Sequence, residues 1–151
     1  MEDPRLRRTP AVGDAPPTRT FGPITRTDIV RYAGASGDFN PIHHDERFAT
    51  EAGFPTVFSI GMFQGALLAT FATDWLGPAA VRRFGVRFKE QVWPDDTLTC
   101  SGTVRSVTSG HEDVLVDLDL LCTRQTGGVA IAGTAQFALS HQSAREGFSA
   151  P

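Results

Sequence analysis

The stretch "SIGMFQGALLATFATDWL", from Ser59 to Leu76, decides the fold because it is the longest helical candidate in the chain. Its apolar residues occur nearly all round a helix, so we expect this helix to be buried on most sides. Small residues recur along it at four-residue spacing and share one face: Gly61, Gly65, Ala69 and Thr73. A stripe of this kind lets another backbone or a sheet approach closely.

The last third of the chain changes to a period of two. Apolar and polar residues alternate in four successive runs, at residues 83–89, 97–104, 114–121 and 129–139, and turn residues separate the runs. This pattern is typical of an antiparallel sheet with one apolar face, which needs a cover. The long helix is the only large partner available. We therefore predict an α+β fold in which a curved antiparallel β-sheet wraps around a long central α-helix, with a further strand near residues 13–21.

Two shorter helices are predicted before the long one. Thr25 can cap a helix over residues 25–35, because Asp28 follows three residues later as in a capping box. Asp45 can cap a second helix over residues 45–52, which Gly53 then ends.

The length and composition indicate one folded domain. The 151 residues suit a single core. Residues 1–17 and 142–151 have the composition of a disordered arm and a flexible tail, which leaves 18–141 as the folded domain. The net charge of -3 argues against nucleic-acid binding, which needs clustered positive charge. We find no signal peptide and no apolar run long enough for a membrane span.

The two cysteines, Cys100 and Cys122, lie in separate strand-like runs and do not form a Cys-x-x-Cys pair. A zinc site or a redox pair is therefore not expected. Two buried free thiols fit a reducing compartment, and we expect a cytoplasmic protein.

The segment "SGDFNPIHHDE", from Ser36 to Glu46, concentrates the chemistry of the chain. Asp38 and His43 lie five residues apart across a turn that contains Gly37 and Pro41. A carboxylate beside an imidazole can orient the ring and help it to deprotonate one water molecule. The alternative is that the two side chains only form hydrogen bonds that stabilise the loop, and the sequence of the turn alone does not decide between the two. A metal site is not expected, because adjacent ligand types such as His43 and His44 rarely point at one ion.

A resemblance adds to this interpretation. The segments "YAGASGDFNPIHHDERFATEAGF" and "GMFQGALLATF" are similar to the MaoC-like dehydratases, the (R)-specific enoyl-CoA hydratases of the hotdog fold. The family signature Ser-Gly-Asp-x-Asn-Pro-[Ile/Leu]-His is complete from Ser36 to His43. The resemblance covers about residues 20 to 140 and implies a single hotdog domain.

The resemblance also implies roles. Asp38 and His43 would bind and activate the water, and Asn40 would support the loop. The Gly61 N–H, at the start of the long helix, would bond the thioester oxygen, where a helix N-terminus favours negative charge. Water would add to a trans-2-enoyl thioester, or leave an (R)-3-hydroxyacyl thioester. No metal or redox cofactor would be required, because CoA or the acyl-carrier arm is part of the substrate.

Two departures from the family pattern are visible. The usual His before Gly-Met is Ile60 here, and a serine often found further along the central helix is Ala69. Both changes remove polar groups, and they are consistent with a wider acyl pocket. For the small stripe, close packing of helix and sheet is the favoured explanation.

The segment "ATDWLGPAAVRRFGVRFKEQVWPDDTLTCSGTV" is similar to actinobacterial single-hotdog dehydratase subunits, which act on fatty acyl or steroid side-chain CoA thioesters. A homodimer or a heterodimer with a second hotdog subunit is expected, because a lone hotdog exposes a sheet edge. Its arginines, Arg82, Arg83 and Arg87, either meet CoA phosphates or form a solvated strand face.

Two other functions remain as alternatives. A non-catalytic or partner-dependent subunit of a heteromeric dehydratase would tend to lose the acid–base pair, whereas Asp38 and His43 are both present. A thioesterase generally carries a carboxylate on or near the central helix, and residues 59–73 contain neither Asp nor Glu.

Overall fold

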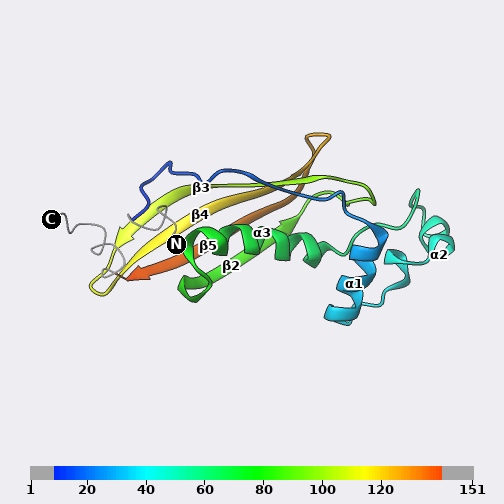
Figure 1. The fold of residues 1–151 in the computed structure, drawn as a ribbon, viewed down its shortest axis with the longest axis horizontal. Helices are drawn as coiled ribbons and strands as arrows, with labels where there is room; N and C mark the ends of the chain where they lie inside the picture. Colours follow the sequence, from blue (N-terminus) through cyan, green and yellow to red (C-terminus); the bar gives the residue numbers. More distant parts are fainter. Residues whose placement is uncertain (1–8, 141–151) are drawn as a thin grey trace, which may run out of the picture.

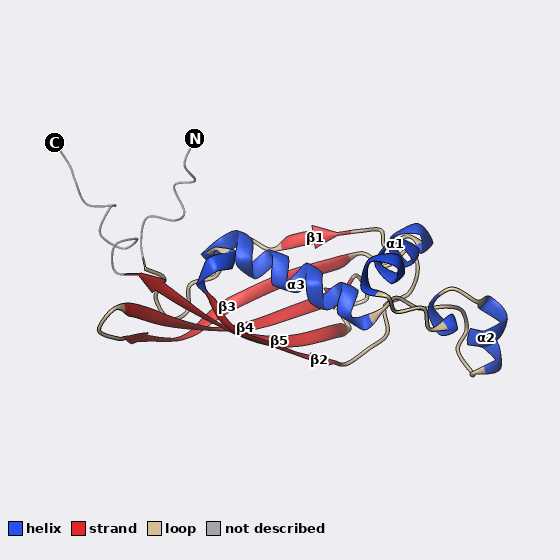
Figure 2. Cartoon of the chain, turned by 90° about the horizontal axis from the view of Figure 1, so that it is seen from below, coloured by secondary structure: helices blue, strands red, loops and turns tan. Residues whose placement is uncertain are grey.

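A five-stranded antiparallel sheet curves around one long helix in the computed structural model, which describes residues 9–140 (Figure 1). The strands are β1 (Arg19–Phe21), β2 (Val81–Phe88), β3 (Leu98–Ser109), β4 (Asp113–Arg124) and β5 (Val129–Ser140), in the spatial order β1-β3-β4-β5-β2. Helix α3 (Gly61–Leu76) crosses one face of this sheet (Figure 2). The predicted α+β architecture is confirmed.

The alternating pattern of the strands produces the buried face. In β4, every second residue is buried: Val114, Val116, Leu118, Leu120 and Cys122. Both neighbours of β4 are antiparallel to it and pair with it along nearly their whole length. Because side chains alternate between faces, this register directs one apolar row of each strand towards α3.

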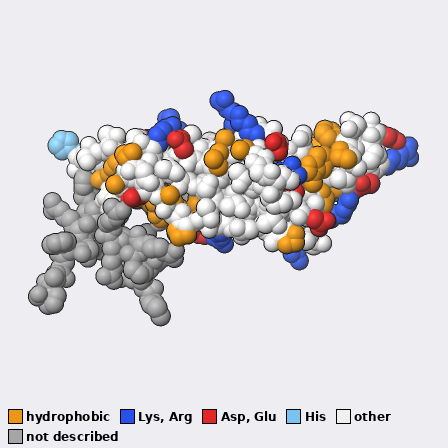
Figure 3. Space-filling model, turned by 90° about the horizontal axis from the view of Figure 1, so that it is seen from above, with side chains coloured by type: hydrophobic (Ala, Val, Ile, Leu, Met, Phe, Trp, Pro, Cys, Tyr) orange, Lys and Arg blue, Asp and Glu red, His pale blue; other side chains and the backbone are white. Residues whose placement is uncertain are grey.

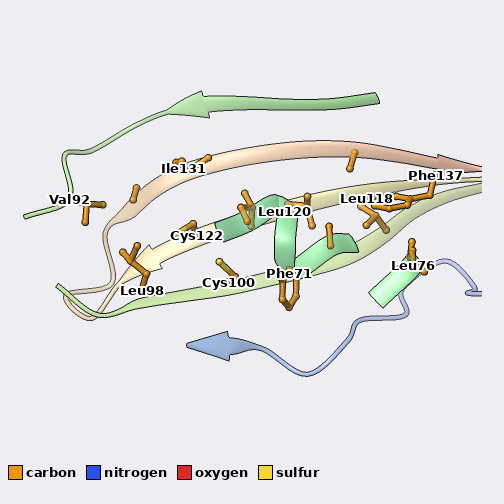
Figure 4. Close-up of a cluster of buried hydrophobic side chains, with 14 of the residues drawn as sticks. Phe71, Leu76, Val92, Leu98, Cys100, Leu118, Leu120, Cys122, Ile131 and Phe137 are labelled. Atoms are coloured by element: carbon orange, nitrogen blue, oxygen red, sulfur yellow. The ribbon is translucent and has the colours of Figure 1, made fainter. Parts of the chain in front are cut away.

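The core lies between the sheet and the inner face of α3. Figure 4 shows Phe71 and Leu76 of the helix among side chains from β3, β4 and β5. Two strand glycines make room for the helix. A Cβ on Gly102 would lie 3.3 Å from the Phe71 ring, and one on Gly133 would lie 3.1 Å from Leu68. Phe71 and Leu68 are 4% and 0% exposed, and full burial of such a side chain stabilises the fold by about 1.5–3 kcal/mol.

The outer face of α3 differs from the prediction. Met62, Ala66, Thr70 and Asp74 are exposed at four-residue spacing, so burial on most sides is wrong for this face. The physical reason is that one sheet covers one side of a helix only. The small stripe faces β2, since a Cβ on Gly61 would lie 2.9 Å from the Phe88 ring and Gly65 lies opposite Val86.

Two short helices and two 3₁₀ turns complete the described chain. Helix α1 (Arg26–Ser36) begins with the predicted capping box, in which Thr25 and Asp28 exchange side-chain and backbone hydrogen bonds. Helix α2 (Glu46–Glu51) begins at Asp45, whose carboxylate accepts the Phe48 N–H at 3.1 Å. The 3₁₀ turns are η2 (Pro41–His43) and η3 (Pro78–Ala80). Both α1 and α2 lie beyond the end of the sheet at which α3 begins (Figures 1 and 2).

The segment before β1 runs along the sheet. The Gly13 N–H donates to the Val104 carbonyl, and the Val104 N–H donates to the Asp14 carbonyl, each at 2.9 Å. The strand expected near residues 13–21 is present as β1 at its C-terminal part. Backbone pairing with β3 thus holds Gly13 and Asp14, which lie within the segment whose composition predicts a disordered arm.

The remaining predicted arm, residues 1–8, and the predicted tail from residue 142 lie outside the described residues. Within residues 9–140, no helix is both long enough and apolar enough to cross a membrane.

Candidate active site

The turn after α1 fixes the carboxylate of Asp38. Helix α1 ends at Gly37, whose φ of 74° lies in the left-handed region that favours glycine. The Asn40 N–H then donates to Asp38 Oδ1 at 3.2 Å, and Asn40 Oδ1 accepts the Ile42 N–H at 3.2 Å. Each side chain thus bonds the backbone two residues on, as short polar residues do in turns. The Asn40 side chain thus takes part in the hydrogen bonds of this turn.

The structure brings Asp38 and His43 together. Asp38 Oδ2 lies 3.9 Å from His43 Nε2. The Asp38 side chain is 43% exposed and that of His43 is 9% exposed, so a half-exposed carboxylate faces a nearly buried ring. The separation is longer than a direct hydrogen bond, and a water molecule can bond both atoms across it.

The backbone sets the tautomer of His43. Its Nδ1 lies 2.8 Å from the carbonyl oxygen of Phe58. A carbonyl oxygen only accepts, so Nδ1 carries the proton and Nε2 of the neutral ring is an acceptor. Both atoms that face each other, Nε2 and Asp38 Oδ2, are therefore able to take a proton from a bound water. The Phe58 ring also meets the His43 ring edge to face, with centroids 5.2 Å apart.

The first turn of α3 offers a free backbone donor. Gly61 is the first helical residue, and the N-cap residue Ile60 provides no side-chain cap. Within residues 9–140, no protein acceptor takes a hydrogen bond from the Gly61 N–H. An uncapped N–H at a helix N-terminus favours a partial negative charge. The Phe88 ring lies over Gly61, as the 2.9 Å approach to its missing Cβ shows.

One backbone segment connects the two halves of the site. The Phe58 carbonyl bonds His43, and Phe58 lies three residues before Gly61. The next N–H, that of Ser59, donates to the Val92 carbonyl at 2.7 Å. His43 is therefore bonded to the segment that leads into α3.

The comparisons with known proteins identify the family of the chain. The family model described as "MaoC like domain" matches residues 8–125. The chain belongs to the MaoC-like family. An (R)-specific enoyl-CoA hydratase of Rhodospirillum rubrum is 34% identical over 114 residues, which cover 74% of this MaoC-like chain and 77% of that protein.

A second relative of the MaoC-like chain is named as a subunit. The 3-oxo-4,17-pregnadiene-20-carboxyl-CoA hydratase beta subunit of Mycobacterium tuberculosis is 35% identical over 85 residues. These residues cover 56% of this chain and 66% of the subunit, so the match spans just under two thirds of that relative. A 3-hydroxyacyl-thioester dehydratase X of the same organism is 44% identical over 78 residues, and the match covers only 27% of it.

Solved structures share the fold of the MaoC-like chain. A chain of the ChsH1–ChsH2 complex of Mycobacterium tuberculosis has a TM-score of 0.76 at 26% identity, over 87% of this chain and 99% of that one. An (R)-hydratase from A. caviae has a TM-score of 0.77 at 23% identity, over 87% and 98% of the two chains. The predicted single hotdog fold is confirmed.

Other candidate residues of the MaoC-like chain lie apart from the pair. His44 Nε2 donates to the Phe39 carbonyl at 3.3 Å, so its ring stabilises the turn between α1 and α2. Cys100 and Cys122 are free thiols that face each other in the core, where the hydrogen bond with Cys122, together with burial, raises the pKa of Cys100. Within the described residues, no group of three or more His, Cys, Asp or Glu could hold a metal ion.

A buried ion pair beside the site was not predicted from the sequence. Asp96 accepts from Arg124 Nε at 2.7 Å, from Gln125 Nε2 at 2.8 Å and from the Trp93 N–H at 2.8 Å. Burial alone raises the pKa of the Asp96 carboxyl, but the hydrogen bonds from Arg124, Trp93 and Gln125 hold this pKa below its ordinary value. Arg124 and Gln125 lie 28 and 29 residues from Asp96 in sequence, so no local motif predicts these two contacts.

Proposed function

We propose that this chain catalyses the (R)-specific hydration of trans-2-enoyl thioesters and the reverse dehydration of (R)-3-hydroxyacyl thioesters. The observation that carries the proposal is the 3.9 Å approach of Asp38 Oδ2 to Nε2 of His43, whose other ring nitrogen is bonded to the Phe58 carbonyl. The similarity to an (R)-specific enoyl-CoA hydratase over most of both chains supports it.

The residues perform the reaction in complementary roles. Asp38 and His43 hold one water molecule between two acceptors, and the pair takes one of its protons as the water oxygen bonds the β-carbon. The electrons of the carbon–carbon double bond move towards the thioester carbonyl. The Gly61 N–H donates to the carbonyl oxygen as negative charge develops there. A proton returns to the α-carbon, so protons and charge balance over the cycle.

The substrate contains the group by which it can be bound. An acyl thioester carries CoA or an acyl-carrier arm, and the reaction requires no metal or redox cofactor. We place the enzyme in the cytoplasm, where the thiols of Cys100 and Cys122 stay reduced.

The active unit is proposed to be a dimer of hotdog subunits, either identical or different. Strand β2 is an edge of the sheet, and Phe88 at its end is 52% exposed. Met62 on the open face of α3 is also 52% exposed. An unpaired edge beside exposed apolar groups is a surface on which a second subunit can pair. The ChsH1–ChsH2 complex is a heteromeric example among similar structures.

A second candidate is a partner-dependent subunit of a heteromeric dehydratase. Similarity to a protein named as a hydratase beta subunit favours it, as do the apolar Ile60 and Ala69. A thioesterase is disfavoured, because α3 carries its one carboxylate, Asp74, near its far end.

The experiment that tests the proposal follows the loss of enoyl absorbance. The purified chain is offered crotonyl-CoA and a bulkier enoyl-CoA, and chiral chromatography identifies the 3-hydroxyacyl product. We expect hydration of at least one substrate to the (R) product, with activity reduced about 10²-fold or more in Asp38→Asn and in His43→Gln. His111→Gln, in the β3–β4 turn, is the matched control and should keep full activity.

Two outcomes would oppose the proposal. Full activity in both site variants would remove the assignment of the pair. Activity that appears only after a second hotdog subunit is added would favour the partner-dependent candidate.

A further inference from the structure

We propose that Trp93, fixed by the buried carboxylate of Asp96, is a positioning residue that holds the His43 ring in its reactive orientation. The inference rests on the proposed hydratase function, because it assigns a task within the same site. It concerns the loop between β2 and β3, which the sequence analysis did not connect with the site.

The loop touches the segment before α3 at two adjacent residues. The Val92 carbonyl accepts the Ser59 N–H at 2.7 Å. The Trp93 ring meets the Phe58 ring nearly at right angles, 74° between the planes, with centroids 5.9 Å apart. Edge-to-face pairs at this distance are attractive. The loop between β2 and β3 therefore contacts both the backbone and a side chain of the segment that precedes α3.

Phe58 is the residue on which the orientation of His43 depends. Its carbonyl takes the Nδ1 proton at 2.8 Å, and its ring meets the imidazole edge to face. Within residues 9–140, this carbonyl forms the hydrogen bond of the His43 ring, and the Asp38 carboxylate faces the other ring nitrogen. A shift of Phe58 would release Nδ1, and the neutral ring would then be free to carry its proton on Nε2, where it could no longer accept.

The position of Trp93 is in turn fixed by Asp96. The Trp93 N–H donates to Asp96 Oδ2 at 2.8 Å, and the Asp96 N–H donates back to the Trp93 carbonyl at 3.2 Å. The Asp96 side chain is only 4% exposed, and Arg124 donates to both of its oxygens, at 2.7 and 3.2 Å. Hydrogen bonds in both directions with a residue whose carboxylate is buried and charge-paired leave the Trp93 backbone little freedom.

The contacts therefore form one continuous path. It runs from the Arg124–Asp96 pair through Trp93 and Phe58 to the Nδ1 of His43. We infer that Trp93 and Phe58 act on the reaction through the His43 ring that they orient.

The test compares Trp93→Leu with Trp93→Phe in the full chain. Two quantities are measured: kcat and KM for an enoyl-CoA, and the His43 tautomer from the ¹⁵N chemical shifts of the imidazole. We expect Trp93→Leu to lower kcat about tenfold or more with KM within twofold of wild type, and to increase the Nε2-protonated tautomer. Trp93→Phe, which keeps an aromatic edge against Phe58, should recover most of the loss.

Trp75→Leu is the matched control, because Trp75 is a half-buried Trp of α3 outside this path. It should lower the melting temperature and leave the tautomer unchanged. Should Trp93→Leu fail to fold, Phe58→Leu tests the same step, since it removes the ring and keeps the carbonyl; it too should increase the Nε2-protonated tautomer.

Several results would overturn the inference. The inference is wrong if Trp93→Leu changes neither the His43 tautomer nor kcat. If only Phe58→Leu folds, the same result in that variant also overturns it. An equal tautomer shift in Trp75→Leu would show that lost stability alone is responsible. Absence of hydratase activity in the wild-type chain would remove the proposed function, yet the tautomer comparison would still decide whether Trp93 orients His43.

Discussion

Replacement of Arg124 by Met is predicted to destabilise the fold strongly. Arg124→Met keeps the aliphatic stem and removes the guanidinium that donates to both oxygens of Asp96. The Asp96 carboxylate, with its side chain 4% exposed, would then remain buried with only the Trp93 N–H and Gln125 as donors. Breaking a buried ion pair from one side costs about 3–5 kcal/mol. A domain of this size loses about 2–4 °C of melting temperature per kcal/mol, so we expect a decrease of at least about 6 °C.

The matched control is Arg105→Met. Arg105 pairs with Asp119 at 3.4 Å, but these side chains are 53% and 59% exposed. An exposed pair contributes about 0–1 kcal/mol, so this variant should unfold close to wild type in urea titrations followed by circular dichroism. A loss for Arg124→Met that is no larger than the loss for Arg105→Met would refute the reasoning.

The pH dependence gives an independent check of the same pair. The pKa of the Asp96 carboxyl is lowered from its ordinary 3.8, so the folded state binds its proton less readily than the unfolded state. The stability from the pair is therefore fully present at neutral pH, above the ordinary pKa. It is lost as the pH falls through the lowered pKa. The stability difference between wild type and Arg124→Met should be largest near pH 7 and should shrink below about pH 4.

Three further predictions concern single residues. Gly61→Ala should leave the free energy of unfolding within about 1 kcal/mol, since the half-exposed Phe88 ring can turn aside, but the added methyl group should lower kcat at least tenfold; unchanged kcat would show that the reacting thioester does not approach the Gly61 Cα. Gly102→Ala should destabilise by about 1–3 kcal/mol in urea, because its Cβ would lie 2.7 Å from Leu120 in the core; a stabilised variant would contradict the packing. Thr25→Ala should cost about 1 kcal/mol by removing the N-cap of α1, and a neutral effect in the same titration would show that the cap is not needed.

The fold was largely predictable because its signals are local. The alternating runs that become β2 to β5 and the capping residues Thr25 and Asp45 each act within a few positions. The exposed face of α3 was not predicted. Apolar residues such as Met62 and Ala66 indicate that a helix face could be buried, but the sequence does not show whether another element packs against that face. The hydrogen bonds of Gly13 and Asp14 with β3 were not predicted, since they depend on β3 and not on the composition of the N-terminal segment.

The candidate site was predictable only in part. The motif placed Asp38, Asn40 and His43 in one turn, where the structure also has them. The contact with the Phe58 carbonyl could not be predicted, because every residue has a backbone carbonyl and the residue type does not show which one accepts a hydrogen bond. The loop of Trp93 reaches the site through tertiary contacts, and these have no sequence spacing to recognise.

Figure 3 shows hydrophobic side chains gathered at the end of the molecule that carries α1 and α2. The large exposed apolar residues of this part are Val30, Phe39 and Phe48, which are 56%, 66% and 44% exposed. Phe39 lies directly between Asp38 and Asn40 in the sequence, so this apolar surface adjoins the turn that carries the proposed base. Its position is consistent with a substrate or a second subunit at this end.

The measurement that tests the central claim most directly is a double-mutant cycle on hydration of an enoyl-CoA. The rates of Asp38→Asn, His43→Gln and the double variant are compared with wild type under the same conditions. If one carboxylate and one imidazole activate the same water, the double variant should lose no more than the worse single variant, about 10²–10⁴-fold. Losses that multiply, or a single variant that keeps the wild-type rate, would contradict a shared water between the two side chains.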